Sequence, residues 1–294
     1  MGWKTDEYVV HTKRPEWGVG KIIRVDSEAV TVFFVGSGKR ALGQPAALIV
    51  LAPPELHCHP LLARIAPSVL SDEVKFLPLR DCVDYFHKLF PDGFYDAAYM
   101  TKDPKAGERH YKVVASEMAH ALLGKAVWEV LIESGKFGEI CQRLAKVESK
   151  TNLLHSFEKI KWHAALKVSH LQKPISISVF NDIYGVGSRM SRFDALAKVL
   201  GELDGCAKWT IATYYGYLLQ PEPRIFIKPE VTKFAAEACG WDLQYQSSLN
   251  WNTLHRAEEM ASYLFAELTR RGLRPRDMID VQSFIWCIDP KSYG

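Results

Sequence analysis

The strongest constraint on this chain is a change in its hydrophobic period near residue 60. Upstream, the runs GVGKIIRV (18–25) and AVTVFFV (29–35) are rich in β-branched and aromatic residues, and KRAL (39–42) begins another short segment. Downstream, apolar residues recur at helical spacing, and the proline-marked stretch APPELHCHP (52–60) separates the two patterns. The sequence therefore predicts a mainly α fold, with a small β-barrel over 1–52, a linker at 53–60 and an all-α domain over 61–294.

The N-terminal segment carries a recognisable motif. Strands this short close most economically into an SH3-like barrel. The stretch VVHTKRPEWGVGKI resembles small bacterial Tudor-like domains of unknown function, whose pattern is matched by His11, Pro15, Glu16, Trp17, Gly18 and Gly20. This resemblance implies a module that binds protein or nucleic acid, with a protein partner possible, and it implies no chemistry. Lys13 and Arg14, inside the motif, are candidate contacts to a DNA backbone.

Beyond the linker, start and stop signals define a series of helices. Thr151 or Asn152 is an expected N-cap, and Gly135 and Gly272 are expected stops. Helices are predicted at 109–134, 136–148, 152–168, 191–202, 207–219, 229–239, 251–271 and 275–288.

Composition narrows the class of protein. A hydrophobic content of 48% and a charged content of 24% are typical of a soluble globular chain, and no apolar run approaches a membrane span. With no signal-peptide pattern at the start, we expect a cytoplasmic bacterial protein without a membrane partner. The six cysteines form no CxxC motif, and the adjacent ligands of HCH (57–59) cannot easily converge on one ion. We therefore expect neither a metal nor another cofactor.

One lysine stands out in PRIFIKPEVTKFAAEACG (223–240). The pattern predicts a short strand at 225–227 and a helix that starts at Pro229, with Lys228 extended at the boundary. A cation at the positive end of a helix is disfavoured by about 0.3–1 kcal/mol, and burial adds to that cost. Both effects favour the neutral amine, which is a nucleophile and Schiff-base former. The alternative is that Lys228 extends along the surface to water.

Upstream of this lysine, LDGCAKWTIATYYGYLL (203–219) reads as two helices joined by a turn at Gly205. The order of hairpin, helix and extended segment resembles the helix-hairpin-helix DNA glycosylases, through Leu203, Gly205, Thr210, Ala212 and the segment FIKPEV. The resemblance implies a double-stranded DNA partner with a damaged or modified base. Here Lys228 and Glu230 occupy the positions of the family's aspartate and histidine, and the hairpin lacks the family's proline and second glycine.

Three other strings resemble segments of an uncharacterised bacterial protein family. They are TNLLHSFEK (151–159), IFIKPEVT (225–232) and PRDMIDVQSFIW (275–286). This resemblance implies a shared fold without naming an activity.

The last predicted helix carries two carboxylates three residues apart. Asp277 and Asp280 share a stripe of the helix and repel each other unless a cation or a shared proton relieves them. This spacing is typical of acid and base groups that divide a reaction between them, so both are candidate catalytic residues. In the alternative interpretation, Asp277 is a favourable N-terminal charge and Asp280 forms a salt bridge with Arg276 or Arg274.

Further candidates would bind the nucleic acid. The stretch from Arg143 to Lys173 contains seven Lys/Arg and two glutamates, an excess of positive charge that fits either a phosphate-binding stripe or a solvated helical face. The predicted DNA-backbone contacts in the helical domain are Gly205, Lys208, Lys159 and Lys161. The predicted base pocket comprises Trp209, Tyr214, Tyr215, Asn152, Glu158 and Gln282, although aromatic residues at helical spacing also suit a core, and Asn152 also suits an N-cap.

Together these features predict a DNA N-glycosylase that extrudes a damaged or modified base, in base repair or in antiviral defence against phages with modified DNA. Lys228 would attack the sugar or assist departure of the base, and Asp280 would stabilise positive charge or activate water. The alternatives are a non-catalytic nucleic-acid-binding adaptor and a helical protein–protein scaffold.

Overall fold

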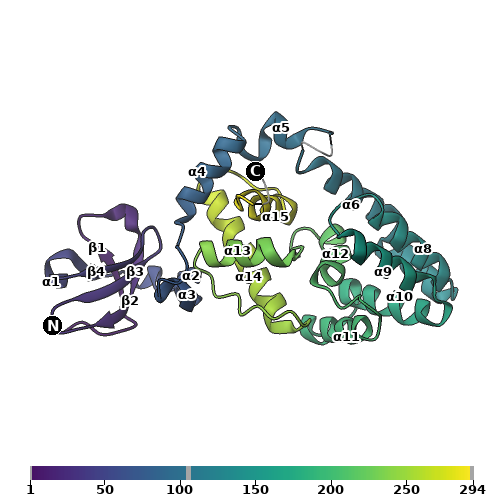
Figure 1. The fold of residues 1–294 in the computed structure, drawn as a ribbon, viewed down its shortest axis with the longest axis horizontal. Coiled ribbons are helices and arrows are strands. Elements are labelled where there is room, and N and C mark those ends of the chain that lie inside the picture. The colour runs from purple at the N-terminus through teal and green to yellow at the C-terminus, as the bar shows by residue number, and fades with distance from the viewer. Residues whose placement is uncertain (1, 104–106, 292–294) are drawn as a thin grey trace.

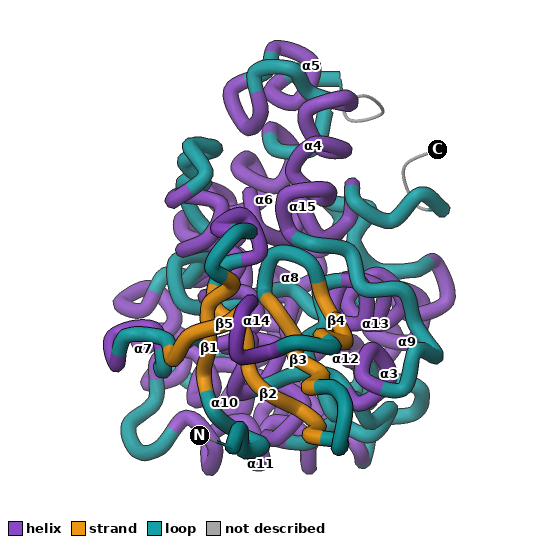
Figure 2. The backbone as a smooth tube through the Cα atoms, turned by 90° about the vertical axis from the view of Figure 1, so that its left-hand side faces the viewer, coloured by secondary structure: helices purple, strands orange, loops and turns teal. Residues whose placement is uncertain are grey.

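A computed structural model describes residues 2–103 and 107–291. A five-stranded antiparallel sheet occupies the N-terminal end, and helices make up the rest of the molecule (Figure 1). The predicted fold class, mainly α with a small N-terminal β domain, is confirmed. Viewed from the sheet end, the strands lie in front of the helical part (Figure 2).

The sheet has the strand order β4-β3-β2-β1-β5. Its strands are β1 (Tyr8–His11), β2 (Val19–Val25), β3 (Val30–Phe34), β4 (Gly38–Leu42) and β5 (Ile49–Leu51). The predicted segments correspond to β2, β3 and β4, whereas β1 and β5 were not predicted. One face encloses a small core, whose buried residues are Val9, Ile22, Val30, Val32, Phe34, Leu42 and Ile49.

Short helices decorate the sheet and lead out of it. They are η1 (Pro15–Trp17), α1 (Pro45–Leu48), η2 (Pro54–Leu56), α2 (Pro60–Ala63) and α3 (Pro67–Leu70), and each begins with proline. Proline suits these starts because its φ is already fixed at a helical value and its missing N–H would have no partner there.

The helical part continues from residue 79. Its elements are α4 (Leu79–Leu89), η3 (Gly93–Tyr95), α5 (Ala97–Met100), α6 (His110–Leu123), α7 (Lys125–Glu133), α8 (Phe137–Glu148), α9 (Ser156–Lys167), α10 (Ser169–Tyr184), α11 (Arg189–Gly201), α12 (Trp209–Leu219), α13 (Pro229–Ala238), α14 (Trp251–Arg270) and α15 (Met278–Cys287). Helix α12 is the centre of this part, because all eleven of its residues are buried. A helix that is apolar all round is one that neighbours cover on every side.

Several predicted boundaries are wrong for local reasons. The helix predicted at 109–134 is interrupted at Gly124, whose backbone is extended, and forms α6 and α7. Residues 225–227 are buried but pair with no strand. Helix α9 starts at Ser156 with His155 as its N-cap, and α15 starts at Met278 with Asp277 as its N-cap, so Pro275 lies outside the helix.

Two long helices were missed altogether, as were the four-residue helices α1, α2, α3 and α5. Helix α10 contains Pro174, and proline inside a run normally argues against a helix. Pro174 is the sixth residue of α10, beyond the first four N–H groups, so it removes the backbone hydrogen bond to the carbonyl of His170, and the rest of the helix forms despite this loss. Helix α4 was also not predicted, and it packs Leu79, Cys82, Val83 and Phe86 into the core.

The sheet packs directly against the helical part. Val32 and Phe34 of β3 fill the sheet core. Phe33 lies between them, so its ring projects from the opposite face of the sheet and joins the core of the helical part. It meets Phe76 edge-on, with ring centroids 5.0 Å apart. Gly240, with φ of +75°, lies just after α13 and leaves room for Phe76, since a Cβ there would come within 3.0 Å of that ring. The end of α13 therefore lies at the junction with the sheet.

Across residues 2–103 and 107–291, no helix combines the length and the apolarity needed to cross a membrane. Among the residues that the structure describes, no three His, Cys, Asp or Glu side chains gather as metal ligands would.

Candidate active site

The segment before Lys228 is fixed to the central helix. The N–H of Ile227 donates to Thr213 Oγ1 of α12 at 3.0 Å. Arg224 donates to Asp182 of α10 at 2.7 Å, which anchors the other end of the segment. Lys228 is the N-cap of α13 and is extended (φ −103°, ψ 104°), as the following proline predicts. The backbone thus presents this lysine from a rigid base.

The amine of Lys228 lies over an aromatic ring. Its Nζ is 3.8 Å from the centroid of Trp286 on α15, and the side chain is half-buried. Within the described part of the chain, the amine has no ion-pair partner. Burial lowers the pKa of Lys228, and the charge of Lys112 lowers it further, while Glu108 and Glu158 act in the opposite direction. The expected direction is therefore confirmed, and its main cause is burial.

Lys112 supplies a fixed positive charge to this site. It lies on α6 and is fully buried, and its Nζ donates to Ser283 Oγ at 2.8 Å, to Gln282 Oε1 at 2.9 Å and to Glu108 Oε2 at 3.2 Å. Burial alone would lower the pKa of Lys112, but Tyr111 and Glu108 outweigh it and raise the pKa. Lys112 thus stays charged while Lys228 is pushed towards the neutral form.

Sequence reasoning missed Lys112, Glu108 and Trp286. One signal for Lys112 was available, because it occupies the same helical face as Ala115 and Ala119, both fully buried. A lysine in such a stripe needs buried partners. Gln282, a predicted base-pocket residue, is one of these partners and therefore lies close to the site.

Glu158 is also brought towards Lys228. Its Oε2 accepts from the backbone N–H of His155 at 2.9 Å, which completes the capping box of α9. Its Oε1 accepts from Thr210 Oγ1 at 2.8 Å, which ties α9 to the first turn of α12. Asn152 is exposed and does not cap the helix.

The two carboxylates of α15 have structural partners. Asp277 caps α15 by accepting from the N–H of Ile279 at 2.9 Å, and it forms a two-pronged ion pair with Arg109. The Asp280 side chain is fully buried and accepts from Tyr99, Arg109 and Arg276 at 2.7–3.0 Å. This arrangement matches the alternative interpretation, in which Asp280 pairs with Arg276. No oxygen of Asp280 is open to a substrate or to water in this arrangement, so the site is built on Lys228 instead.

The predicted stacking residues lie in the core. Trp209, Tyr214 and Tyr215 are each at most 3% exposed. Trp209 Nε1 donates to the carbonyl of Gln246 at 2.8 Å, Tyr214 Oη lies 2.7 Å from Thr151 Oγ1, and Tyr215 Oη accepts from Trp162 Nε1 at 2.8 Å. These rings are closed to a base in this conformation, and the aromatic face beside Lys228 belongs to Trp286.

The predicted DNA-backbone contacts fall in two places. Gly205, with φ of +70°, makes the expected turn between α11 and α12, and Lys208 is the exposed N-cap of α12. Lys161 pairs with Asp204 beside this turn, and Lys159 pairs with Glu148 at 3.0 Å. Lys13 and Arg14 follow β1, where Arg14 lies 3.6 Å from Glu16. Their roles in binding stay predictions.

Comparison with known proteins informs only the sheet. Residues 6–50 match the model of a family described as a protein of unknown function (DUF3553). No curated protein and no solved structure matches the chain.

Proposed function

We propose that the helical part is a DNA N-glycosylase that excises a damaged or modified base, with Lys228 as the nucleophile. The observation that carries the proposal is the half-buried amine of Lys228, which has a lowered pKa and no ion-pair partner within the described residues. An amine of this kind is the form of lysine that attacks an electrophilic carbon. A lysine kept for structure would instead be paired, as Lys112 is.

The proposed reaction uses the neutral amine at the sugar. The nitrogen lone pair of Lys228 forms a bond to C1′, and the bond between C1′ and the base breaks, with its electron pair leaving on the base, which takes up a proton. The amine loses a proton, the sugar ring opens, and an imine joins Lys228 to C1′. Water then hydrolyses the imine and regenerates the lysine, so no cofactor is consumed.

Positive charge that develops on the sugar needs a nearby carboxylate. Glu108 and Glu158 are the carboxylates whose charges act on Lys228. The proposal gives them the role that the sequence assigned to Asp280, because the oxygens of Asp280 are already occupied by Tyr99 and two arginines.

The turn at Gly205 supports a DNA ligand. It precedes α12, whose first-turn N–H groups and exposed Lys208 can hold a phosphate. The same helix fixes Lys228 through the bond from Ile227 to Thr213. A phosphate held at one end of α12 would thus be in a fixed relation to the amine.

Borohydride trapping on duplex DNA carrying varied modified bases tests the proposal. Reduction of the imine should link the protein covalently to the DNA, and Lys228→Ala should abolish the adduct. Lys233→Ala is the matched control, because Lys233 lies on the same helix and pairs with Glu230 at 2.8 Å. This control should trap normally.

Three results would overturn the proposal. An adduct that survives in Lys228→Ala would remove this residue as the nucleophile. Salt-sensitive DNA binding without an adduct or base release on any substrate would favour the adaptor. A lack of DNA binding at low salt would favour the protein–protein scaffold.

A further inference from the structure

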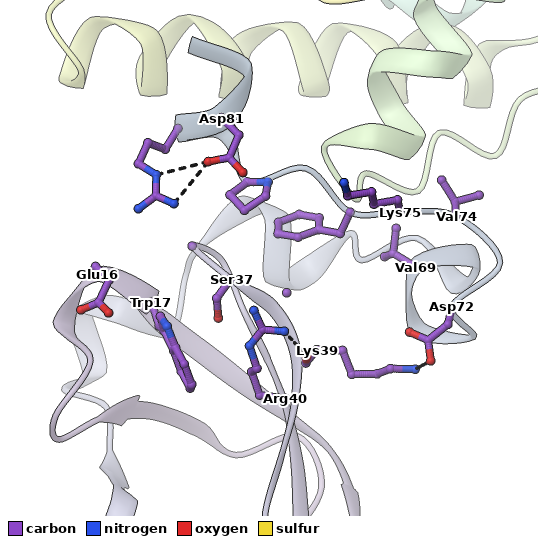
Figure 3. A pocket seen from close by; sticks show the side chains of 15 residues that line it. Glu16, Trp17, Ser37, Lys39, Arg40, Val69, Asp72, Val74, Lys75 and Asp81 are labelled. Atoms are coloured by element: carbon purple, nitrogen blue, oxygen red, sulfur yellow. Dashed lines mark hydrogen bonds and ion pairs between the residues drawn. The ribbon is translucent and has the colours of Figure 1, made fainter. Parts of the chain in front are cut away.

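A cleft of about 660 Å³ separates the sheet from the chain that leads into α4 (Figure 3). Trp17, Ser37 and Arg40 line it from the sheet, and Lys75 and Asp81 line it from the opposite side. This volume is in the range of sites that bind small molecules or a few units of a polymer. The cleft lies outside the site around Lys228.

The charges in this cleft are unequally paired. Its three carboxylates each have a cation: Asp72 pairs with Lys39, Asp81 with Arg80, and Glu16 with Arg14. Arg40 and Lys75 also line the cleft, and within the described residues neither has a carboxylate partner. The uncompensated charge is therefore positive, which favours an anionic ligand.

The neighbouring groups suit a phosphate. The Arg40 guanidinium lies 5.5 Å from the ring centroid of Trp17, and among the described residues its hydrogen bond is to the carbonyl of Lys39, at 3.1 Å. Ser37 Oγ is buried and has no hydrogen-bond partner among the described residues. A buried hydroxyl without a partner costs free energy unless a ligand or water satisfies it. A phosphate oxygen can accept from both the serine and the arginine.

The cleft is joined to Lys228 by a single helix. Phe76 lines the cleft and contacts Gly240 at the end of α13, while Lys228 is the N-cap at the start of α13. The ten residues of this helix correspond to about 15 Å along its axis. Because phosphates on one strand of a duplex repeat about every 3.4 Å along its axis, this length corresponds to about four base pairs.

We propose that this cleft binds the phosphodiester backbone of a DNA strand, through Arg40, Lys75 and Ser37. The binding claim stands on the cleft alone, whereas the offset of about four base pairs rests on the proposed function of Lys228. The N-terminal domain would then extend the DNA-binding surface without reading sequence.

The test measures binding of the full chain to a fluorescently labelled, undamaged DNA duplex at a series of salt concentrations. The double variant Arg40→Ala, Lys75→Ala should bind more weakly, and its slope of log K against log salt should be less steep by about 1.8, since each phosphate contact contributes about 0.9. The matched control Lys88→Ala, Lys136→Ala removes two exposed lysines of α4 and of the N-cap of α8. Its slope should be unchanged.

Further variants distinguish phosphate binding by the cleft from a loss of folding and from binding of an acidic peptide. The charge-preserving variant Arg40→Lys, Lys75→Arg should keep the native slope, and circular dichroism should show that all variants are folded. Because the duplex is undamaged, the slope is measured whether or not a base is ever released, so failure of the proposed glycosylase activity leaves this test intact. An unchanged slope in the double alanine variant, or no DNA binding by the native chain, would overturn the proposal. If the double alanine variant loses affinity for polyglutamate but keeps its affinity for DNA, the proposal is overturned in favour of an acidic peptide ligand.

Discussion

Replacing Asp280 by asparagine distinguishes a structural carboxylate from a catalytic one. The Asp280 side chain is fully buried at the junction of α15 with the chain between α4 and α6. Its Oδ1 accepts from Tyr99, Arg109 and Arg276, and its Oδ2 accepts from the backbone N–H and Nε of Arg276. Asp280 therefore accepts all of these hydrogen bonds and donates none.

Asparagine keeps the volume of this side chain but places an NH₂ donor where one oxygen accepts hydrogen bonds. Whichever oxygen is replaced, the new NH₂ group faces at least two donors, and Arg276 loses its negative partner. Breaking a buried ion pair by removing one partner costs about 3–5 kcal/mol, because the remaining charge is buried without compensation. Asp277 still pairs with Arg109, so we expect a loss of about 3 kcal/mol.

Urea unfolding followed by far-ultraviolet circular dichroism measures this loss, because helices dominate that signal in this chain. Asp194→Asn, an exposed change on α11, is the control and should stay within about 0.5 kcal/mol of the native chain. If Asp280→Asn unfolds at the native urea concentration and yet releases no base, the structural assignment is refuted and Asp280 is a catalytic group.

Two further predictions concern the amine and the hairpin. Only the neutral amine reacts with an acylating reagent, so the lowered pKa of Lys228 should place the midpoint of its labelling rate below pH 10.5. Lys233, whose pKa is raised by its hydrogen bond to Glu230, should have a midpoint above pH 10.5. Mass spectrometry of labelled peptides measures both midpoints, and the reverse order would contradict the assignment. Gly205→Ala forces alanine to adopt φ of +70° and should cost about 1–2 kcal/mol in urea unfolding, whereas Gly201→Ala, which has open space around it, should cost nothing measurable.

Local patterns predicted much of the fold. The change of period separates the sheet from the helices, and the Pro229 signal correctly places the start of α13. The errors arise where tertiary contacts overrule local preference. Residues 225–227 are apolar and extended like a strand, but their backbone is held by Thr213 of α12 in place of a strand partner.

The candidate site was harder to predict, because its residues lie far apart in the sequence. Lys228 was identified from its position before Pro229, which is a local feature. Trp286, whose ring the amine contacts, comes from α15. Lys112, whose charge lowers the pKa of the amine, comes from α6. Asp277 and Asp280 have the spacing of an acid and base pair, but both are held in ion pairs with arginines, and the packing of the helices sets which arginine each one meets.

The two carboxylates still act on the site through the helix that they hold. Arg109 binds Asp277 and Asp280 one residue before α6 begins, so it fastens the start of α6 to the start of α15. Helix α6 carries Lys112, whose charge lowers the pKa of Lys228, and α15 carries Trp286, whose ring lies against the amine. Lys112 then joins the same helices again through Gln282 and Ser283. Because these buried contacts fix both helices, Lys112 and Trp286 keep their places relative to Lys228, and the packing of α6 against α15 contributes to the lowered pKa of Lys228.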